Sequence, residues 1–230
     1  MATILNIETS TNACSVALSA EGMILRHFED FKGQNHAALV SDMVKACLDH
    51  LREHEMNLDA VAVSMGPGSY TGLRIGLSEA KGLAFALDLP LIGVDTLQLL
   101  AVSMMFNHEL PENVLLAPMI DARRMEVYTA VYDMALTPLL KPCPMILDGN
   151  SYSQWLNGDA VVAFAGNGSA KAREVIKSDN AMFIDGVDAL AVDMVALSDR
   201  AYARSEFIDI AYSTPYYLKE FQATKPKSPF

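Results

Sequence analysis

A glycine-rich turn is the feature of this sequence best suited to phosphate chemistry. The apolar, β-branched segment 59–65 predicts a strand, and the residues GPGSYTGLRIG follow it over 66–76. Where a strand runs through glycines into a helix, free N–H groups and the positive end of the helix dipole can bind an anion. The turn is not a P-loop, because the lysine of that motif is missing. The alternative is a tight strand-to-helix turn in which Ser69 or Thr71 caps the helix.

Three further polar turns stand where predicted strands end. Residues 8–10 could hold phosphate with their N–H and hydroxyl groups, or they form an ordinary hairpin turn. Residues 121–123 could orient a metal or a phosphate, or form a turn with an internal ion pair. The Gly-Asn-Gly turn at 166–168 would face adenosine in a nucleotide site. The candidate nucleotide-binding residues are Glu8, Thr9, Ser10, Gly66, Gly68, Ser69, Asp121, Arg123, Gly166, Asn167 and Gly168.

Metal-ligating and nucleophilic side chains are sparse. His50 and His54 are four residues apart and share a helix face, a spacing that can bind a metal, but the mostly charged run 49–55 favours a solvated helix end. The three cysteines form no CxxC pair, which argues against a disulfide framework and a structural zinc site. No Ser/His/Asp or Cys/His grouping indicates a nucleophile. We therefore expect no catalytic residue and no metal site.

A stripe of small residues runs along the helix predicted after the glycine turn. Glycine inside a helix costs about 1 kcal/mol relative to alanine, so a sequence that keeps it there gains close backbone contact. That contact could be with the chain's own sheet or with another helix across an interface. Leucines beside the stripe add apolar surface that must be covered. The stripe comprises Gly72, Gly76, Ala80 and Ala84, with Leu73 and Leu77 next to it.

Hydrophobic periodicity predicts the elements that position these turns. The first half has the order βββαβαβα, in which helices separate the later strands, as parallel crossovers require. The second half repeats this theme less clearly. Strands are predicted over 3–8, 13–19, 23–30, 59–65, 91–94, 113–120, 125–133 and 161–165, and helices over 34–55, from 70 to just before 89, from 96, and over 151–156, 169–177 and 188–205.

These elements predict an α/β protein with two lobes. We expect an N-terminal lobe over 1–105, with helices at about 34–55 and 70–87, and a C-terminal lobe over 106–230. The helix at 188–205 could pack back on the first lobe. The tail at 222–230 holds prolines and lysines and is expected to fray.

Charge and hydropathy exclude several classes of function. Lys and Arg total 17 against 28 Asp and Glu, a net charge of −11, so phosphate backbones should repel the chain and direct nucleic-acid binding is not expected. The N-terminus has no basic segment followed by an apolar stretch, which predicts no signal peptide. The most apolar region, 83–106, is broken by Asp88, Pro90 and Asp95, so no membrane span is expected. We expect a cytoplasmic protein.

The four turns, in this order, resemble those of the actin/hexokinase/sugar-kinase (ASKHA) superfamily, whose two lobes clasp ATP between two phosphate loops and an adenosine loop. More closely, the chain resembles the TsaB (YeaZ) family throughout its length. The resemblance rests on residues 4–11, the glycine-rich turn 66–76, DARRMEVY at 121–128 and PYYL at 215–218. It implies that each lobe is a mixed sheet flanked by helices.

The resemblance also implies a part in making threonylcarbamoyladenosine next to the anticodon of tRNA. The TsaB-like subunit is similar to the catalytic TsaD subunit without being the catalyst. It pairs with TsaD, helps recruit the small ATPase TsaE, and meets tRNA only through the complex. Family members self-associate around their first two helices, which implies a homodimer when the chain is alone. The interface residues implied here are His36, Leu39, Met43, Leu73, Gly72, Gly76, Leu77, Ala80 and Ala84.

Two positions bear on catalysis. When the chain is aligned with TsaD, the HxxxH metal-binding pair of that paralogue corresponds to Thr96 and Leu100. Neither side chain can replace imidazole as a metal ligand. We therefore expect a non-catalytic subunit with no tightly bound cofactor and at most weak binding of ATP or ADP. The alternative is a stand-alone ATP-dependent phosphotransferase or hydrolase, for which Glu8 and Asp121 are the candidate acids. A metallopeptidase is the third hypothesis, and it lacks a credible metal triad.

Overall fold

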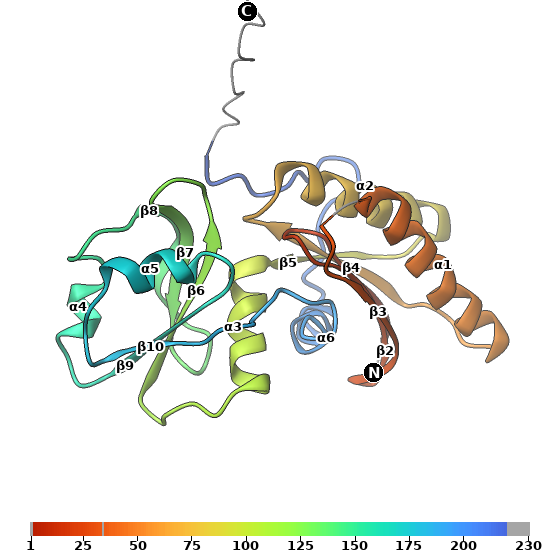
Figure 1. Ribbon diagram of the computed structural model, residues 1–230. Helices are drawn as coiled ribbons and strands as arrows, with labels where there is room; N and C mark the ends of the chain where they lie inside the picture. Colours follow the sequence, from red (N-terminus) through yellow and green to blue (C-terminus); the bar gives the residue numbers. More distant parts are fainter. Residues whose placement is uncertain (1, 34, 220–230) are drawn as a thin grey trace, which may run out of the picture.

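The computed structural model describes residues 2–33 and 35–219, which form two lobes, each built on a five-stranded sheet. Helices α3 (Thr96–Asn107) and α6 (Val195–Ala203) lie between the two sheets (Figure 1). This is the two-lobed, actin-like α/β fold that the sequence predicts, and the prediction of fold class is confirmed. None of the helices within the described ranges is long and apolar enough to cross a membrane.

The first sheet has the strand order β3-β2-β1-β4-β5. Strands β1 to β3 form an antiparallel meander, and β4 and β5 add in parallel to β1 by way of helical crossovers. Helices α1 and α2 contact the sheet and each other. The elements are β1 (Thr3–Glu8), β2 (Cys14–Ala20), β3 (Met23–Asp30), α1 (His36–Glu53), β4 (Ala60–Gly66), α2 (Tyr70–Leu87) and β5 (Leu91–Asp95).

The second sheet repeats this topology, with the order β8-β7-β6-β9-β10. Again three antiparallel strands are extended by two parallel ones, so the two lobes share a plan that is barely visible in the sequence. The elements are β6 (Val114–Asp121), β7 (Glu126–Tyr132), β8 (Pro138–Ile146), α4 (Ser153–Leu156), β9 (Val161–Ala165), α5 (Ser169–Val175) and β10 (Ala181–Phe183).

Three hydrophobic clusters hold these layers together. One lies under α1 and α2 on the first sheet, and one lies under α4 and α5 on the second. The third surrounds α3 and α6 and includes residues from both sheets. Helix α3 is apolar on every side, which is the pattern of a helix buried all round. The lobe boundary predicted near residue 105 falls inside this helix, which contacts strands of both sheets.

Three elements differ from the sequence predictions. Strand β8 was not predicted because it contains three prolines, which a strand tolerates at the edge of a sheet, where β8 lies. The three-residue strand β10 also went unpredicted. The helix expected over 188–205 begins only at Val195, and α6 contacts β1 and β5 of the first lobe. Gln34, the first residue of the predicted 34–55 helix, and the tail at 222–230 lie outside the described residues.

Candidate functional site

The turn after β1 and the glycine-rich turn after β4 meet at the carboxyl ends of their strands. The backbone N–H of Ser69 donates to the carbonyl of Ser10 at 2.7 Å. The hydroxyl of Thr9 donates to the carbonyl of Gly72 at 2.8 Å. Both hydroxyl-bearing residues of the first turn are buried. The structure therefore brings Thr9, Ser10 and Ser69 together, as a phosphate site would require, but it joins them directly to one another.

Glycines in the turn before α2 and in α2 itself make this close approach possible. A Cβ atom on Gly68 would overlap the carbonyl oxygen of Ser10. A Cβ on Gly72 would overlap the carbonyl oxygen of Thr9, and a Cβ on Gly76 would overlap the hydroxyl of Thr9. The three positions accept only glycine because the first turn lies against the helix backbone.

These contacts occupy several of the groups that could bind an anion. Besides the N–H of Ser69, the N–H of Ser10 donates to the Glu8 carboxyl at 2.5 Å, and the N–H of Gly72 donates to the Ser69 hydroxyl, which caps α2, at 3.2 Å. The C-terminal segment covers the remaining side of the turn, since the N–H of Tyr216 donates to the carbonyl of Met65 at 2.6 Å. A Cβ on Gly66 would lie 2.7 Å from the Tyr216 carbonyl oxygen. A phosphate would have to displace these internal hydrogen bonds.

The predicted interface stripe is part of this internal packing. Gly72, Gly76, Ala80 and Ala84 are buried within the chain, and so are Leu73 and Leu77. The stripe packs against the turn after β1 and the chain's own sheet, so these six residues are buried in the folded chain. The other implied interface residues, His36, Leu39 and Met43, are half-buried on α1.

Glu8 is buried at the end of β1, beneath the first turn. Burial raises the pKa of its carboxyl group to about 7, although hydrogen bonds from Ser10 oppose the shift. Burial thus disfavours the charged carboxylate form of Glu8 in the folded chain.

The second-lobe turns form a separate cluster. The Asp121 N–H donates to Oδ1 of Asn167 at 2.8 Å, and Lys171 Nζ lies 2.6 Å from Oδ1 of Asp121. The N–H of Arg123 also donates to the Asp121 carboxylate. Asp121 is ion-paired, but its partner is Lys171 of α5, which the sequence analysis did not name, and not a residue inside the turn. Gly166 and Gly168 again serve close packing, here against the backbone of Met119 and Ile120.

The positions aligned with a metal-binding histidine pair lie in the interlobe core. Thr96 is the first residue of α3 and is fully buried, and Leu100 is 1% exposed. Asp95 caps this helix by accepting from the N–H groups of Leu97 and Gln98 at 2.8 and 2.9 Å. Burial raises the pKa of Asp95 to about 6. Its Oδ1 atom accepts both bonds and thereby satisfies the N-terminal end of the helix.

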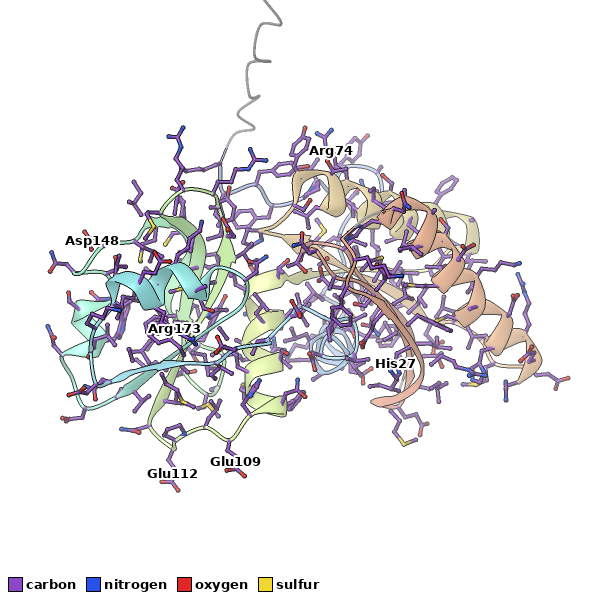
Figure 2. The ribbon with its side chains drawn as sticks, viewed as in Figure 1. His27, Arg74, Glu109, Glu112, Asp148 and Arg173 are labelled. Atoms are coloured by element: carbon purple, nitrogen blue, oxygen red, sulfur yellow. The ribbon has the colours of Figure 1, made fainter. Side chains whose placement is uncertain are left out.

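The outer face of α2 offers a different kind of site. A groove with a volume of about 620 Å³ runs between α1 and α2. Arg74 lies 4.2 Å from the centre of the Tyr70 ring, and its Nε donates to the Tyr217 hydroxyl at 3.0 Å. Figure 2 shows Arg74 at the outer edge of the first lobe, beside the C-terminal segment. The groove is lined by Ala37, Tyr70, Thr71, Arg74, Ile75, Ser78 and Glu79.

Comparison with known proteins establishes the family. A family model described as "TsaD: tRNA N6-adenosine threonylcarbamoyltransferase" matches residues 30–225. The tRNA threonylcarbamoyladenosine biosynthesis protein TsaB of Escherichia coli (strain K12) is 33% identical, with 96% of each chain covered. The chain belongs to the TsaB (YeaZ) family. The protein of the same name from Bacillus subtilis (strain 168) is 30% identical, over 76% of this chain and 75% of its own.

A solved structure of the same family has the same fold. YeaZ from Pseudomonas aeruginosa superposes on this chain with a TM-score of 0.81 at 30% sequence identity. The match covers 95% of this chain and 100% of that one. The two-lobed arrangement is thus that of the TsaB family over almost the whole chain.

Sequence reasoning identified the turns of this TsaB-family chain but missed the groove. Periodicity marks which residues of a helix are apolar, whereas the groove is made of mixed residues at the seam of two helices. A local signal does exist, because Tyr70 and Arg74 are four residues apart and therefore stack on one helix face.

Proposed function

We propose that this chain is a non-catalytic partner subunit in the biosynthesis of threonylcarbamoyladenosine in tRNA. The observation that carries the proposal is the closed glycine turn, in which Ser10 occupies the N–H of Ser69. The relatives named above are biosynthesis proteins of this modification, and the matching family model bears the name of the transferase. A chain that keeps the fold while filling its own phosphate loops fits a binding role better than a catalytic one.

The partner is expected to be the TsaD-like catalytic subunit, with a TsaE-like ATPase recruited to the pair. The exposed face of α1 and α2 supports this, because its groove combines Tyr70 and Arg74, residue types that are enriched in protein interfaces. A second copy of the chain would use the same face when the catalytic subunit is absent. Contact with tRNA is expected only through the complex, given the net charge of −11. All of these partners imply a cytoplasmic location.

Co-purification with the TsaD-like subunit tests this proposal. Ala37→Arg places a long cation in the groove at an exposed position, so it should abolish the complex and leave the circular dichroism of the chain unchanged. Ala170→Arg, the same change at an exposed position of α5, is the matched control and should retain the complex. Gly76→Arg would instead test folding, since Gly76 lies against Thr9 inside the chain.

The outcomes separate the competing functions. A complex that survives Ala37→Arg would contradict docking in the groove. If the wild-type chain forms no complex but hydrolyses ATP with magnesium, the stand-alone ATP-dependent enzyme is the better reading. We expect no such turnover, because internal hydrogen bonds close the turn above Glu8 and Lys171 forms an ion pair with Asp121.

A further inference from the structure

The end of α1 gathers three metal-ligating side chains that the proposed function does not use. One ligand atom each from His50, Glu53 and His54 lies within 4.8 Å of the other two. The two imidazole rings are tilted by 40° to each other, with centroids 4.1 Å apart. The sequence analysis considered the histidine pair alone and favoured a solvated helix end. The structure adds Glu53 as a third ligand on the same turn.

A hydrogen bond fixes the tautomer of His54. Nδ1 of His54 lies 2.9 Å from the carbonyl oxygen of His50. A carbonyl oxygen only accepts, so Nδ1 of His54 carries the proton and Nε2 presents its lone pair. A second-shell bond of this kind orients the histidine ligands of most metal sites.

The distances suit a small transition-metal ion. Zinc binds nitrogen and oxygen at about 2.0–2.2 Å in a tetrahedron, which places the ligand atoms about 3.3 Å apart. A set already within 4.8 Å reaches that spacing by small rotations of side chains that are exposed or half-buried. The position at the C-terminal end of α1 also favours a cation, because the helix dipole is negative there.

We propose that His50, Glu53 and His54 form a binding site for a divalent transition metal of the zinc type, with water in the fourth position. Two imidazoles and one carboxylate select such an ion over Mg²⁺, which prefers oxygen ligands throughout. The site lies at the C-terminal end of α1, away from the four turns where a catalytic metal is not expected. It is independent of the proposed function.

The positive charge of Arg26 should weaken metal binding at this site, so a substitution of Arg26 provides a control for the proposal. Its Nε donates to Nδ1 of His50 at 3.3 Å, so a positive charge stands beside the site and occupies one ligand. Removing the guanidinium in Arg26→Ala should therefore strengthen zinc binding several-fold. Zinc bound far from Arg26 would not respond to this change, because salt screens charges at that distance.

The experiment is a calorimetric titration of Zn²⁺ into chelator-treated, tag-free protein. We expect one zinc per chain, loss of binding in His50→Ala and in His54→Ala, and weaker binding in Glu53→Gln. His27→Ala, an exposed histidine of β3 outside the cluster (Figure 2), should bind as the wild type does, and Mg²⁺ should produce no signal.

Three results would overturn the site. One is no zinc binding by the wild type, and another is equal binding of Mg²⁺. The third is binding that survives the double substitution of His50 and His54, and such binding would also contradict our expectation that no other part of the chain holds a metal tightly. Because each variant changes a surface side chain, thermal unfolding should confirm that all of them are folded.

Discussion

The two faces of α2 use neighbouring residues for opposite purposes. The inner face presents Gly72 and Gly76 to the turn after β1, so closely that no side chain fits between them. The outer face presents Arg74 and Ser78 to a groove. Helical periodicity separates the two sets, since residues four apart share a face. The helix thus stabilises the fold with one face and leaves the other exposed, and the proposed function assigns partner binding to that exposed face.

The inner face gives the largest expected effect. Gly72→Ala should lower the free energy of unfolding by about 2 kcal/mol or more, because its Cβ would overlap the Thr9 carbonyl oxygen and force the turn away. Gly82→Ala is the matched control on the same helix. A Cβ at Gly82 meets no atom within 4 Å, so this change should stabilise the chain by about 0.5–1 kcal/mol.

The free energy of unfolding of both variants, measured in denaturant, tests whether the two substitutions have effects of opposite sign on stability. Equal effects of the two substitutions would mean that the turn after β1 is not fixed against α2, and the account of the closed phosphate loop would fail.

The carboxyl group beneath this turn gives a pH-dependent effect. The pKa of Glu8 is about 7 in the folded chain, against 4.5 as its ordinary value. The folded state therefore binds more protons than the unfolded state between these values, so the Glu8 contribution to stability falls as pH rises from 4.5 to 7. The loss reaches roughly 3 kcal/mol above pH 7. Glu8→Gln keeps an oxygen for the Ser10 N–H but cannot ionise.

Unfolding free energies measured between pH 5 and 8 check this prediction. The variant should gain stability relative to the wild type as the pH rises, and the difference should level off above neutrality. A difference that does not change with pH would show that Glu8 is not buried as a neutral acid. Asp95, whose pKa is also raised, is present in both proteins and cancels from the comparison.

The sequence predicted the inner face better than the outer one. Most of the strands and helices and all four polar turns follow from periodicity and turn chemistry, which are local properties of the chain. The contacts between the turns are not local, because they join residues that are far apart in the sequence. The bond from Ser69 to Ser10 joins residues 59 positions apart, and only the folded chain shows that the two turns satisfy one another. The glycine stripe was ambiguous for the same reason.

The prolines of β8 and the lysine that pairs with Asp121 show the same limit in the second lobe. Proline is disfavoured in strands generally, but β8 lies at the sheet edge, and edge position is a property of the whole sheet. Lys171 reaches Asp121 from α5, 50 residues away. In both cases the deciding contact depends on topology rather than on a motif.

The outer face gives the smallest effect on stability and the most specific effect on binding. Arg74→Ala removes the contact with the Tyr70 ring and the bond to the Tyr217 hydroxyl, both at the exposed surface. Its cost in unfolding free energy should stay below about 1 kcal/mol. Its cost in affinity for the TsaD-like partner should be larger, about tenfold, because an arginine at the centre of an interface contributes strongly.

Tyr217→Phe separates the two roles of Arg74. It removes the hydroxyl that accepts from Arg74 and keeps the ring that lies 5.1 Å from Tyr70. If Arg74 binds the partner directly, Tyr217→Phe should leave affinity nearly unchanged while Arg74→Ala lowers it. If both variants weaken binding equally, Arg74 acts only when Tyr217 holds it in place. If neither does, as measured by calorimetry of the purified pair, the partner does not use this groove, and the division of labour between the faces of α2 is wrong.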